Sequence, residues 1–212
     1  AESFDPMQLE RTFTIRTSDG FAENFGPSLI ERVRSEAPKA RLRFVQKQDK
    51  ASSGLRDGTI DLETGVVGDE IGPEVRAKTL FKDQFVGVVS AGHILSKGKV
   101  TLTGYLKCGH ISISRHGTFQ GPIDDALASL GETREITVTV SGFATAIALA
   151  RTTDLVATVP ERHTANLREG LRSFTPPFPT PGLTISLLWH PRMDADRAHR
   201  WLRALIQDAC SK

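Results

Sequence analysis

The chain has 212 residues, of which 39% are hydrophobic and 25% are charged, a balance that is typical of a globular protein and excludes a disordered or fibrous one. Its 27 Lys and Arg are interspersed with 25 Asp and Glu, so no basic face for direct binding of nucleic acid is expected. No apolar run approaches the roughly 20 residues that span a bilayer, and no membrane partner is expected.

The first half of the chain alternates strand and helix patterns. Period-two or β-branched apolar runs predict strands at 12–17, 41–45 and 60–67. A four-residue apolar period predicts an amphipathic helix between Pro27, which suits a first helical turn, and Pro38, which cannot continue a helix. With a further short helix at 53–57, the order of elements favours a parallel sheet with crossover helices.

The same alternation starts again in the second half. Strands are predicted at 110–114, 135–140 and 154–159. Helices are predicted at 123–130, 143–150 and 160–168, the last because proline is favoured at a first helical position. These elements make a second β-α-β unit. A proline-rich extended connector at 176–181 and a helix at 194–210 complete the chain.

Two apolar strands at 85–90 and 183–189 bracket the second unit, so we expect the chain to leave the first lobe along one and return along the other. This predicts an α/β fold of two Rossmann-like subdomains joined by two crossover strands. Subdomain I takes 12–87 and 186–212, and subdomain II takes 88–185. Ligands of open α/β sheets bind outside the carboxyl ends of the strands, which predicts a cleft that holds a small anionic organic molecule.

Polar turns join a strand to a helix in both halves, at 18–21, 114–118 and 141–143. Such turns present backbone N–H groups and the positive end of a helix dipole, which suit a carboxylate, and His116 would add to this. Local capping explains Ser, Thr and Asp at these places equally well. Core packing is the alternative role of Phe143.

The sequence contains no GxSxG elbow, no GxxxxGK[ST] phosphate loop, no GxGxxG and no HExxH, so no enzyme is expected. Its six histidines lack metal-ligand spacing, and Cys108 and Cys210 lie too far apart for a CxxC element. We therefore expect reduced thiols, no metal and no cofactor. A hydrolytic trio of Ser114, His116 and Asp124 lacks the strained turn that presents a nucleophile.

Several stretches, in their order and spacing, resemble the effector-binding domain of LysR-type transcriptional regulators, and the resemblance covers nearly the whole chain. The stretches are FDP at 4–6, RTFTI at 11–15, SD at 18–19, LRDGTIDL at 55–62, TDLVATVPER at 153–162, LWHPR at 188–192 and RWLR at 200–203. This version is most similar to the branch that responds to aromatic acids and flavonoids.

The resemblance implies a type II periplasmic-binding-protein-like pair of subdomains in a cytoplasmic homodimer, or in a tetramer at full length. It also implies a small effector that changes how the assembly sits on promoter DNA. Members of the family bind DNA through an N-terminal winged helix-turn-helix and a linker helix. Residues 1–11 correspond to the end of that linker, so this chain is expected to reach promoter DNA only through that missing segment.

The family's effector-binding positions correspond to a set of residues in turns and at strand ends. His116 is added to this set because it lies in one of the same turns. They are Ser18, Asp19, Phe21, Gln46, Gly117, Thr118, Phe119, Gln120, Ser141, Gly142, Phe143 and Thr184. Regulators of the salicylate type are expected to carry histidines near the positions of Gln120 and Gly142. This chain has neither histidine, which implies a roomier, less basic pocket and a larger or less acidic effector.

Two other functions fit a two-lobed clamp. A free solute-binding protein of a transporter would share the fold, but it would be exported and usually monomeric. An enzyme on the same scaffold, such as a deaminase or a dehydratase, would need catalytic residues that the sequence does not show. A dimer encoded downstream of a helix-turn-helix would favour the regulator, and a turnover screen would detect the enzyme.

Overall fold

The computed structural model describes residues 4–47, 53–69 and 71–211. The chain divides into two compact units, unit 1 at Ala1–Lys82 with Thr184–Lys212 and unit 2 at Asp83–Leu183. The boundaries predicted at 87/88 and 185/186 lie inside two strands, β5 (Phe85–Val89) and β10 (Leu183–Trp189). Among the described residues, every helix is too short or too polar to cross a membrane.

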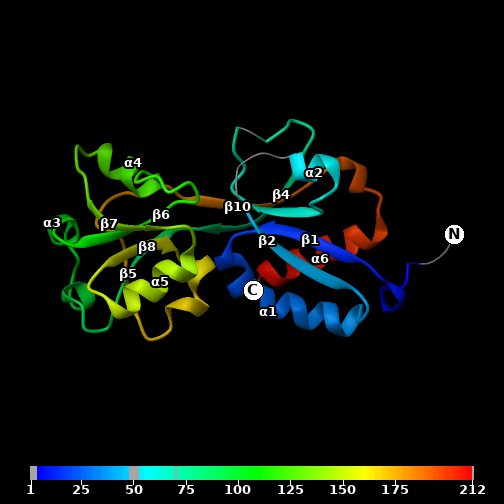
Figure 1. The fold of residues 1–212 in the computed structure, drawn as a ribbon, viewed down its shortest axis with the longest axis horizontal. Helices are drawn as coiled ribbons and strands as arrows, with labels where there is room; N and C mark the ends of the chain where they lie inside the picture. Colours follow the sequence, from blue (N-terminus) through cyan, green and yellow to red (C-terminus); the bar gives the residue numbers. More distant parts are fainter. Residues whose placement is uncertain (1–3, 48–52, 70, 212) are drawn as a thin grey trace. The chain divides into compact units, whose positions relative to one another are not determined.

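Unit 1 is built on a five-stranded mixed sheet with the strand order β2-β1-β3-β10-β4. Its other strands are β1 (Thr12–Thr17), β2 (Arg41–Gln46), β3 (Leu62–Gly65) and β4 (Arg76–Asp83). β1 pairs in parallel with both β2 and β3, whereas β10 runs antiparallel to β3. The β-α-β-α-β pattern therefore supplies the parallel half of the sheet, and β10 joins it from the far end of the chain (Figure 1).

Helices cover this sheet on both sides. α1 (Asp19–Glu36) and α6 (Arg197–Cys210) lie together below the strands in Figure 1, and α2 (Ser53–Asp57) lies above them. The Arg32 guanidinium on α1 donates to the Asp208 carboxylate on α6 at 3.0 Å. Two 3-10 turns, η1 (Pro6–Gln8) and η5 (Pro191–Met193), complete the unit.

Helix α1 starts at Asp19, so the predicted start near Pro27 is wrong. Ser18 caps the helix, because its Oγ accepts a hydrogen bond from the Phe21 N–H at 3.1 Å. Pro27 lies inside the helix, where its nitrogen has no hydrogen to donate to the carbonyl of Glu23. Packing of the buried apolar stripe of α1 on the sheet outweighs the local preference that the proline signals.

Unit 2 contains a second five-stranded mixed sheet, with the strand order β7-β6-β8-β5-β9. Its strands besides β5 are β6 (Gly109–Ile113), β7 (Glu135–Val140), β8 (Val156–Pro160) and β9 (Arg172–Phe174). β6 pairs in parallel with β7 and β8, and β5 is antiparallel to β8 and β9. The helices and 3-10 turns are η2 (Ile94–Ser96), α3 (Leu102–Leu106), α4 (Pro122–Ala128), α5 (Phe143–Thr152), η3 (Arg162–Thr164) and η4 (Asn166–Arg168).

The helix predicted at 160–168 is wrong. Pro160 ends β8 and pairs with Phe85, and only the two short turns η3 and η4 follow it. Proline at a first helical position and proline at a strand end look alike in sequence, and the antiparallel pairing with β5 decides between them. Strands β4 and β9 were not predicted. The last helix starts at Arg197, because the Asp196 side chain caps it by accepting a hydrogen bond from the His199 N–H.

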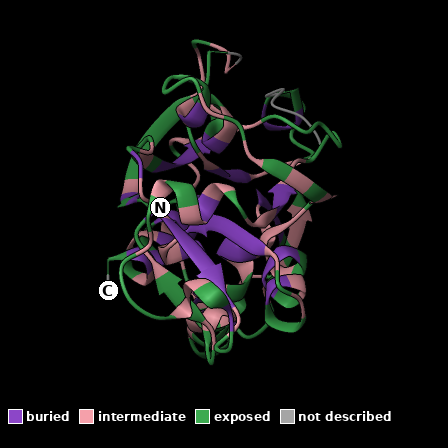
Figure 2. Ribbon diagram, turned by 90° about the vertical axis from the view of Figure 1, so that its left-hand side faces the viewer, coloured by how far each residue is buried: buried purple, intermediate pink, exposed green. Residues whose placement is uncertain are grey.

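Each unit has its own apolar core. Ile15 and Leu187 of the sheet and Leu202 of α6 are fully buried in unit 1, and an apolar cluster that includes Val88 and Ile147 fills unit 2. Buried residues concentrate on the strands and exposed residues on the loops (Figure 2). The two sheets therefore give rigid platforms, and the loops at their strand ends carry the predicted site residues.

Candidate functional site

A pocket of about 400 Å³ lies between α1 and β2 in unit 1. The carboxyl ends of β1 and β2 and residues 19–30 of α1 form it. Its lining residues are Thr17, Ser18, Asp19, Ala22, Glu23, Pro27, Ile30, Phe44, Val45 and Gln46. Three of them, Ser18, Asp19 and Gln46, were predicted from the sequence, so the structure brings together residues from two separate strand ends.

The polar end of this pocket is the amino terminus of α1. The Phe21 N–H donates to the Ser18 hydroxyl, and the Gly20 N–H donates to the Asp19 carboxylate at 2.7 Å. The Ala22 N–H donates to the Ser18 carbonyl at 3.1 Å. These first N–H groups therefore have partners within the turn, and the Asp19 carboxylate offsets the positive end of the helix dipole.

The opposite wall of the pocket is apolar. Pro27 and Ile30 of α1 and Phe44 and Val45 of β2 form it, and Ile30 is 43% exposed. An apolar wall with a few polar groups at one end is typical of a site for a small molecule with a ring.

The charge of the lining is negative. Asp19 and Glu23 carry carboxylates, and none of the described lining residues is Lys, Arg or His. Glu23 is exposed. The pocket of unit 1 therefore offers hydrogen-bond acceptors more than positive charge, which differs from the anion site predicted for this turn.

A buried charged network supports the strand ends behind the pocket. Arg16 of β1 donates to one oxygen of Glu63 on β3 through Nε at 3.1 Å and Nη2 at 2.6 Å, and Lys47 forms an ion pair with the other oxygen. The hydroxyls of Thr17 and Thr64 also form a hydrogen bond. Paired charges in a desolvated place fix geometry, because any displacement leaves a charge uncompensated. This network holds β1 and β3 in register next to the pocket.

Phe21 does not reach the pocket. Its side chain is 1% exposed, and its ring centroid lies 4.9 Å from that of Phe25 in the core of unit 1. The residue thus anchors the first turn of α1. Its side chain offers no exposed surface for the predicted contact with an effector. Thr184, at the start of β10, is exposed.

In unit 2 the predicted residues His116, Gly117, Thr118, Phe119 and Gln120 share one exposed loop between β6 and α4. The loop is ordered by its own hydrogen bonds: the Thr118 N–H donates to the Ser114 hydroxyl at 3.1 Å, and the Thr118 hydroxyl donates to the Gln120 carbonyl at 3.2 Å. Gly117 has φ of 68°, a left-handed conformation that favours glycine. Phe119 is 66% exposed, which leaves its ring open to a partner.

The hydrolytic trio considered for this loop does not assemble. Asp124 accepts two hydrogen bonds from the Arg134 guanidinium, at 2.7 and 3.1 Å, and one from the Gly121 N–H at 3.0 Å. The Asp124 carboxylate therefore fixes the start of α4 and does not orient His116.

The third polar turn, Ser141, Gly142 and Phe143, lies between β7 and α5. Gly142 is the N-cap of α5 and provides no side-chain capping bond, and the Ala146 N–H donates to the Gly142 carbonyl at 3.3 Å. Ser141 is exposed, and Phe143 is half-buried against the apolar cluster of unit 2. The start of α5 therefore depends on the packing of Phe143, as the alternative reading of that residue predicted.

No group of three or more His, Cys, Asp or Glu side chains within residues 4–47, 53–69 and 71–211 could hold a metal ion. His93, His110, His163 and His199 are buried and bind main-chain carbonyls or a carboxylate. Cys108 and Cys210 are free thiols, as predicted.

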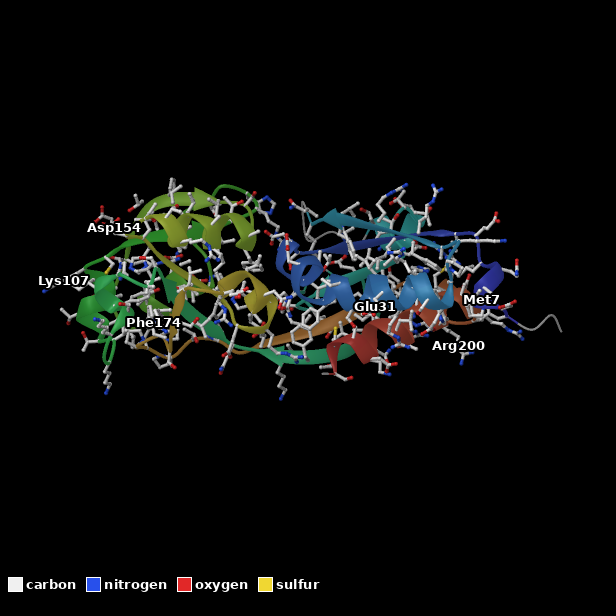
Figure 3. All side chains as sticks on the ribbon, turned by 90° about the horizontal axis from the view of Figure 1, so that it is seen from below. Met7, Glu31, Lys107, Asp154, Phe174 and Arg200 are labelled. Atoms are coloured by element: carbon white, nitrogen blue, oxygen red, sulfur yellow. The ribbon has the colours of Figure 1, made fainter. Side chains whose placement is uncertain are left out.

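Most of the pocket lining was missed by the sequence analysis. Glu23, Pro27 and Ile30 are spaced as one face of a helix, and Phe44 pairs with Ile15 across β1 and β2. The spacing was visible in the sequence, but the rotation of α1 on the sheet decides which face meets β2. Figure 3 shows this layer from below, with Glu31 on α1 and Arg200 on α6 labelled.

Comparison with known proteins defines the class. The LysR substrate binding domain matches residues 7–211, so the chain belongs to this family, as its sequence motifs predicted. The transcriptional activator NahR of Pseudomonas putida is 30% identical over 98% of this chain and 70% of its own length. The α/β fold with its two mixed sheets matches effector-binding domains of the periplasmic-binding-protein-like type, which confirms the predicted fold class.

Solved structures agree with this assignment. The probable transcriptional regulator PA0477 from Pseudomonas aeruginosa has a TM-score of 0.85 and 31% identity, over 96% of this chain and 69% of that one. The BenM effector-binding domain, solved with its effector benzoate, has a TM-score of 0.74 over 96% of this chain and 94% of its own. At 17% identity BenM shows the fold alone. The chain is the effector-binding domain of a LysR-type regulator.

Proposed function

We propose that this domain senses a small aromatic effector at the pocket of unit 1, and that binding changes how the whole regulator acts on its promoter. One observation carries the proposal: Ser18, Asp19 and Gln46, from two strand ends, line one pocket of about 400 Å³ with an apolar wall. That volume is in the range of small-molecule sites. A ligand can drive such a change only through different affinities for two states of the protein.

The chemistry of the lining favours a neutral hydroxylated aromatic molecule over an aromatic carboxylate. The carboxylates of Asp19 and Glu23 are acceptors, so they suit hydroxyl donors and repel an anion. The apolar wall of Pro27 and Phe44 suits the face of a ring. This agrees with the less acidic effector that the missing histidines imply.

Unit 2 is proposed to contribute polar contacts. Ser141 is an exposed hydroxyl at a strand-to-helix turn, and Thr118 belongs to the ordered loop before α4. These two side chains are the best candidates for hydrogen bonds with the effector. The other predicted contacts remain predictions; they are His116, Gly117, Phe119, Gln120, Gly142, Phe143 and Thr184.

The assembly follows from the class of the relatives. We propose a cytoplasmic homodimer, or a tetramer at full length, that contacts promoter DNA through a segment outside this domain and has no catalytic activity of its own. NahR and PA0477 are both named as transcriptional regulators. A solute-binding protein of a transporter is not favoured, because these relatives are regulators.

A thermal-shift experiment tests the site. Benzoate, salicylate, 2-naphthol and 7-hydroxyflavone are titrated against the chain, and the midpoint of unfolding is measured. A compound at 100 times its Kd stabilises a protein by about 2.7 kcal/mol. For a protein of this size that is a rise of roughly 5–10 °C. 7-Hydroxyflavone and 2-naphthol are expected to give the larger shifts.

A pocket-filling variant locates the binding. Ala22→Phe places a ring in the pocket and is expected to remove the shift, whereas Glu31→Phe, on an exposed position of the same helix, is expected to keep it. An equal shift in both variants would place the effector elsewhere.

A further inference from the structure

A buried carboxylate–imidazole pair lies where the chain enters unit 2. Asp83 is the last residue of β4 and the first of unit 2, and its side chain is 0% exposed, against 7% for His163. One carboxylate oxygen accepts from the His163 Nδ1 at 2.8 Å and the His163 N–H at 3.2 Å. The other accepts from the N–H groups of Gln84 and Arg162, both at 2.8 Å.

These four hydrogen bonds fix the charge of Asp83 and the position of His163. Burial alone would raise the pKa of Asp83, but the donors His163, Arg162 and Gln84 together lower it below its usual value, so the group is a carboxylate. A carboxylate only accepts, so His163 presents its Nδ1 as the donor. Asp83 therefore sets the orientation of the imidazole through one bond to the ring and one to the His163 main chain.

The same imidazole packs against the start of α5. The ring centroids of His163 and Phe143 lie 6.1 Å apart at an interplanar angle of 57°, within the range of a favourable aromatic contact. Phe143 is the first residue of α5, and the N-cap Gly142 provides no side-chain bond. Packing therefore replaces capping at this helix end, and His163 is one of the groups that supply it.

We propose that Asp83 and His163 are positioning residues of the effector site: Asp83 orients the His163 ring, the ring holds Phe143, and Phe143 sets the turn that presents Ser141. The inference rests on the proposed function, because it takes Ser141 to contact the effector. Neither Asp83 nor His163 touches the effector in this account. Both act through the first turn of α5.

The test removes the ring contact between His163 and Phe143 while it keeps the hydrogen bond between residue 163 and Asp83. In His163→Asn the amide nitrogen takes the place of Nδ1 and keeps the bond to Asp83, but the ring contact with Phe143 is lost. His93→Asn is the matched control, since His93 is also buried in unit 2 and bonds to the Asp154 carbonyl and the Leu95 N–H. Both variants remove a buried imidazole of the same unit.

Two readouts decide the outcome. Amide hydrogen exchange at Ala146, whose N–H closes the first turn of α5, is expected to become about tenfold faster in His163→Asn and to stay unchanged in His93→Asn. The affinity for 7-hydroxyflavone is expected to fall about tenfold in His163→Asn only. Unchanged exchange at Ala146, or faster exchange with unchanged affinity, would overturn the proposal.

The exchange readout does not need a ligand. If 7-hydroxyflavone fails to bind the unmodified chain, the effector class proposed above fails, and unchanged exchange at Ala146 still overturns the positioning role. Asp83→Asn adds a second variant, because one of the two acceptor oxygens becomes an amide nitrogen, so two of the four N–H donors lose their acceptor. Faster exchange at Ala146 is expected there too, and normal exchange in a folded Asp83→Asn protein would contradict the role of Asp83.

Discussion

Gly26 of α1 packs against the tip of the Phe44 ring on β2: a Cβ built on Gly26 would sit 3.9 Å from two carbons of that ring. This is an ordinary contact distance, so alanine fits the space. Gly26→Ala is expected to stabilise the protein by about 0.5–1 kcal/mol, because glycine costs a helix interior that much. Urea unfolding measures the change, and a lower midpoint in the variant would show that α1 must shift on β2.

The pocket carboxylates are expected to set the preference for neutral effectors. Glu23→Gln removes a negative charge from the lining, so binding of benzoate should strengthen relative to binding of 7-hydroxyflavone. Glu31→Gln makes the same change in charge on the same helix outside the lining. Titration calorimetry of both variants measures the ratio of affinities, and an equal ratio in the two would dismiss the role of Glu23.

The buried network behind the pocket is expected to be costly to break. Glu63→Gln leaves Arg16 and Lys47 without their shared carboxylate, and removing one partner of such a buried pair costs about 3–5 kcal/mol. Glu74→Gln breaks an exposed ion pair with Arg56 and should have little effect. Denaturant midpoints compare the two, and equal losses would argue against the network.

Protonation of His110 is expected to lower the free energy of unfolding in mild acid. Burial lowers the pKa of His110 to about 4, although its hydrogen bond to the Tyr105 carbonyl opposes this shift. The neutral imidazole is therefore favoured in the folded state: its contribution is complete above the unfolded value near 6.5 and is lost as the pH falls toward 4. The loss is on the order of 3 kcal/mol.

His110→Gln tests this slope. The amide of glutamine takes the place of Nε2 and does not titrate, so the stability advantage of the unmodified protein should shrink between pH 6.5 and 4. His110 Nδ1, the atom that would gain the proton, has no partner among the described residues. Burial also lowers the pKa of His199, so some acid dependence remains in the variant. Parallel stability curves for the two proteins would contradict the assignment.

Local patterns determined much of the fold. The strands at 12–17, 135–140 and 183–189 and the helix at 53–57 have the predicted bounds, because period-two or apolar runs with clear turns carry their own signal. Pro27 and Pro160 misled the prediction of two helices. At both, packing or pairing with a distant segment outweighed the local preference.

Some residues of the candidate site were likewise predictable from the sequence, and others were not. Ser18 was predictable, because a polar turn between a strand and a helix lies at the carboxyl edge of a parallel sheet, and Gln46 was expected from the resemblance to the family. Glu23 and Phe44 were not, because their meeting depends on how α1 is rotated on β2. The contact of His163 with Asp83 joins η3 to the end of β4, far apart in the sequence, and has no local signature.

Amide chemical-shift mapping of the chain with 7-hydroxyflavone tests the central claim most directly. The account predicts that the largest changes cluster at Ser18, Asp19 and Gln46 in the pocket of unit 1. Binding that leaves those three amides unmoved, while others shift, would contradict it.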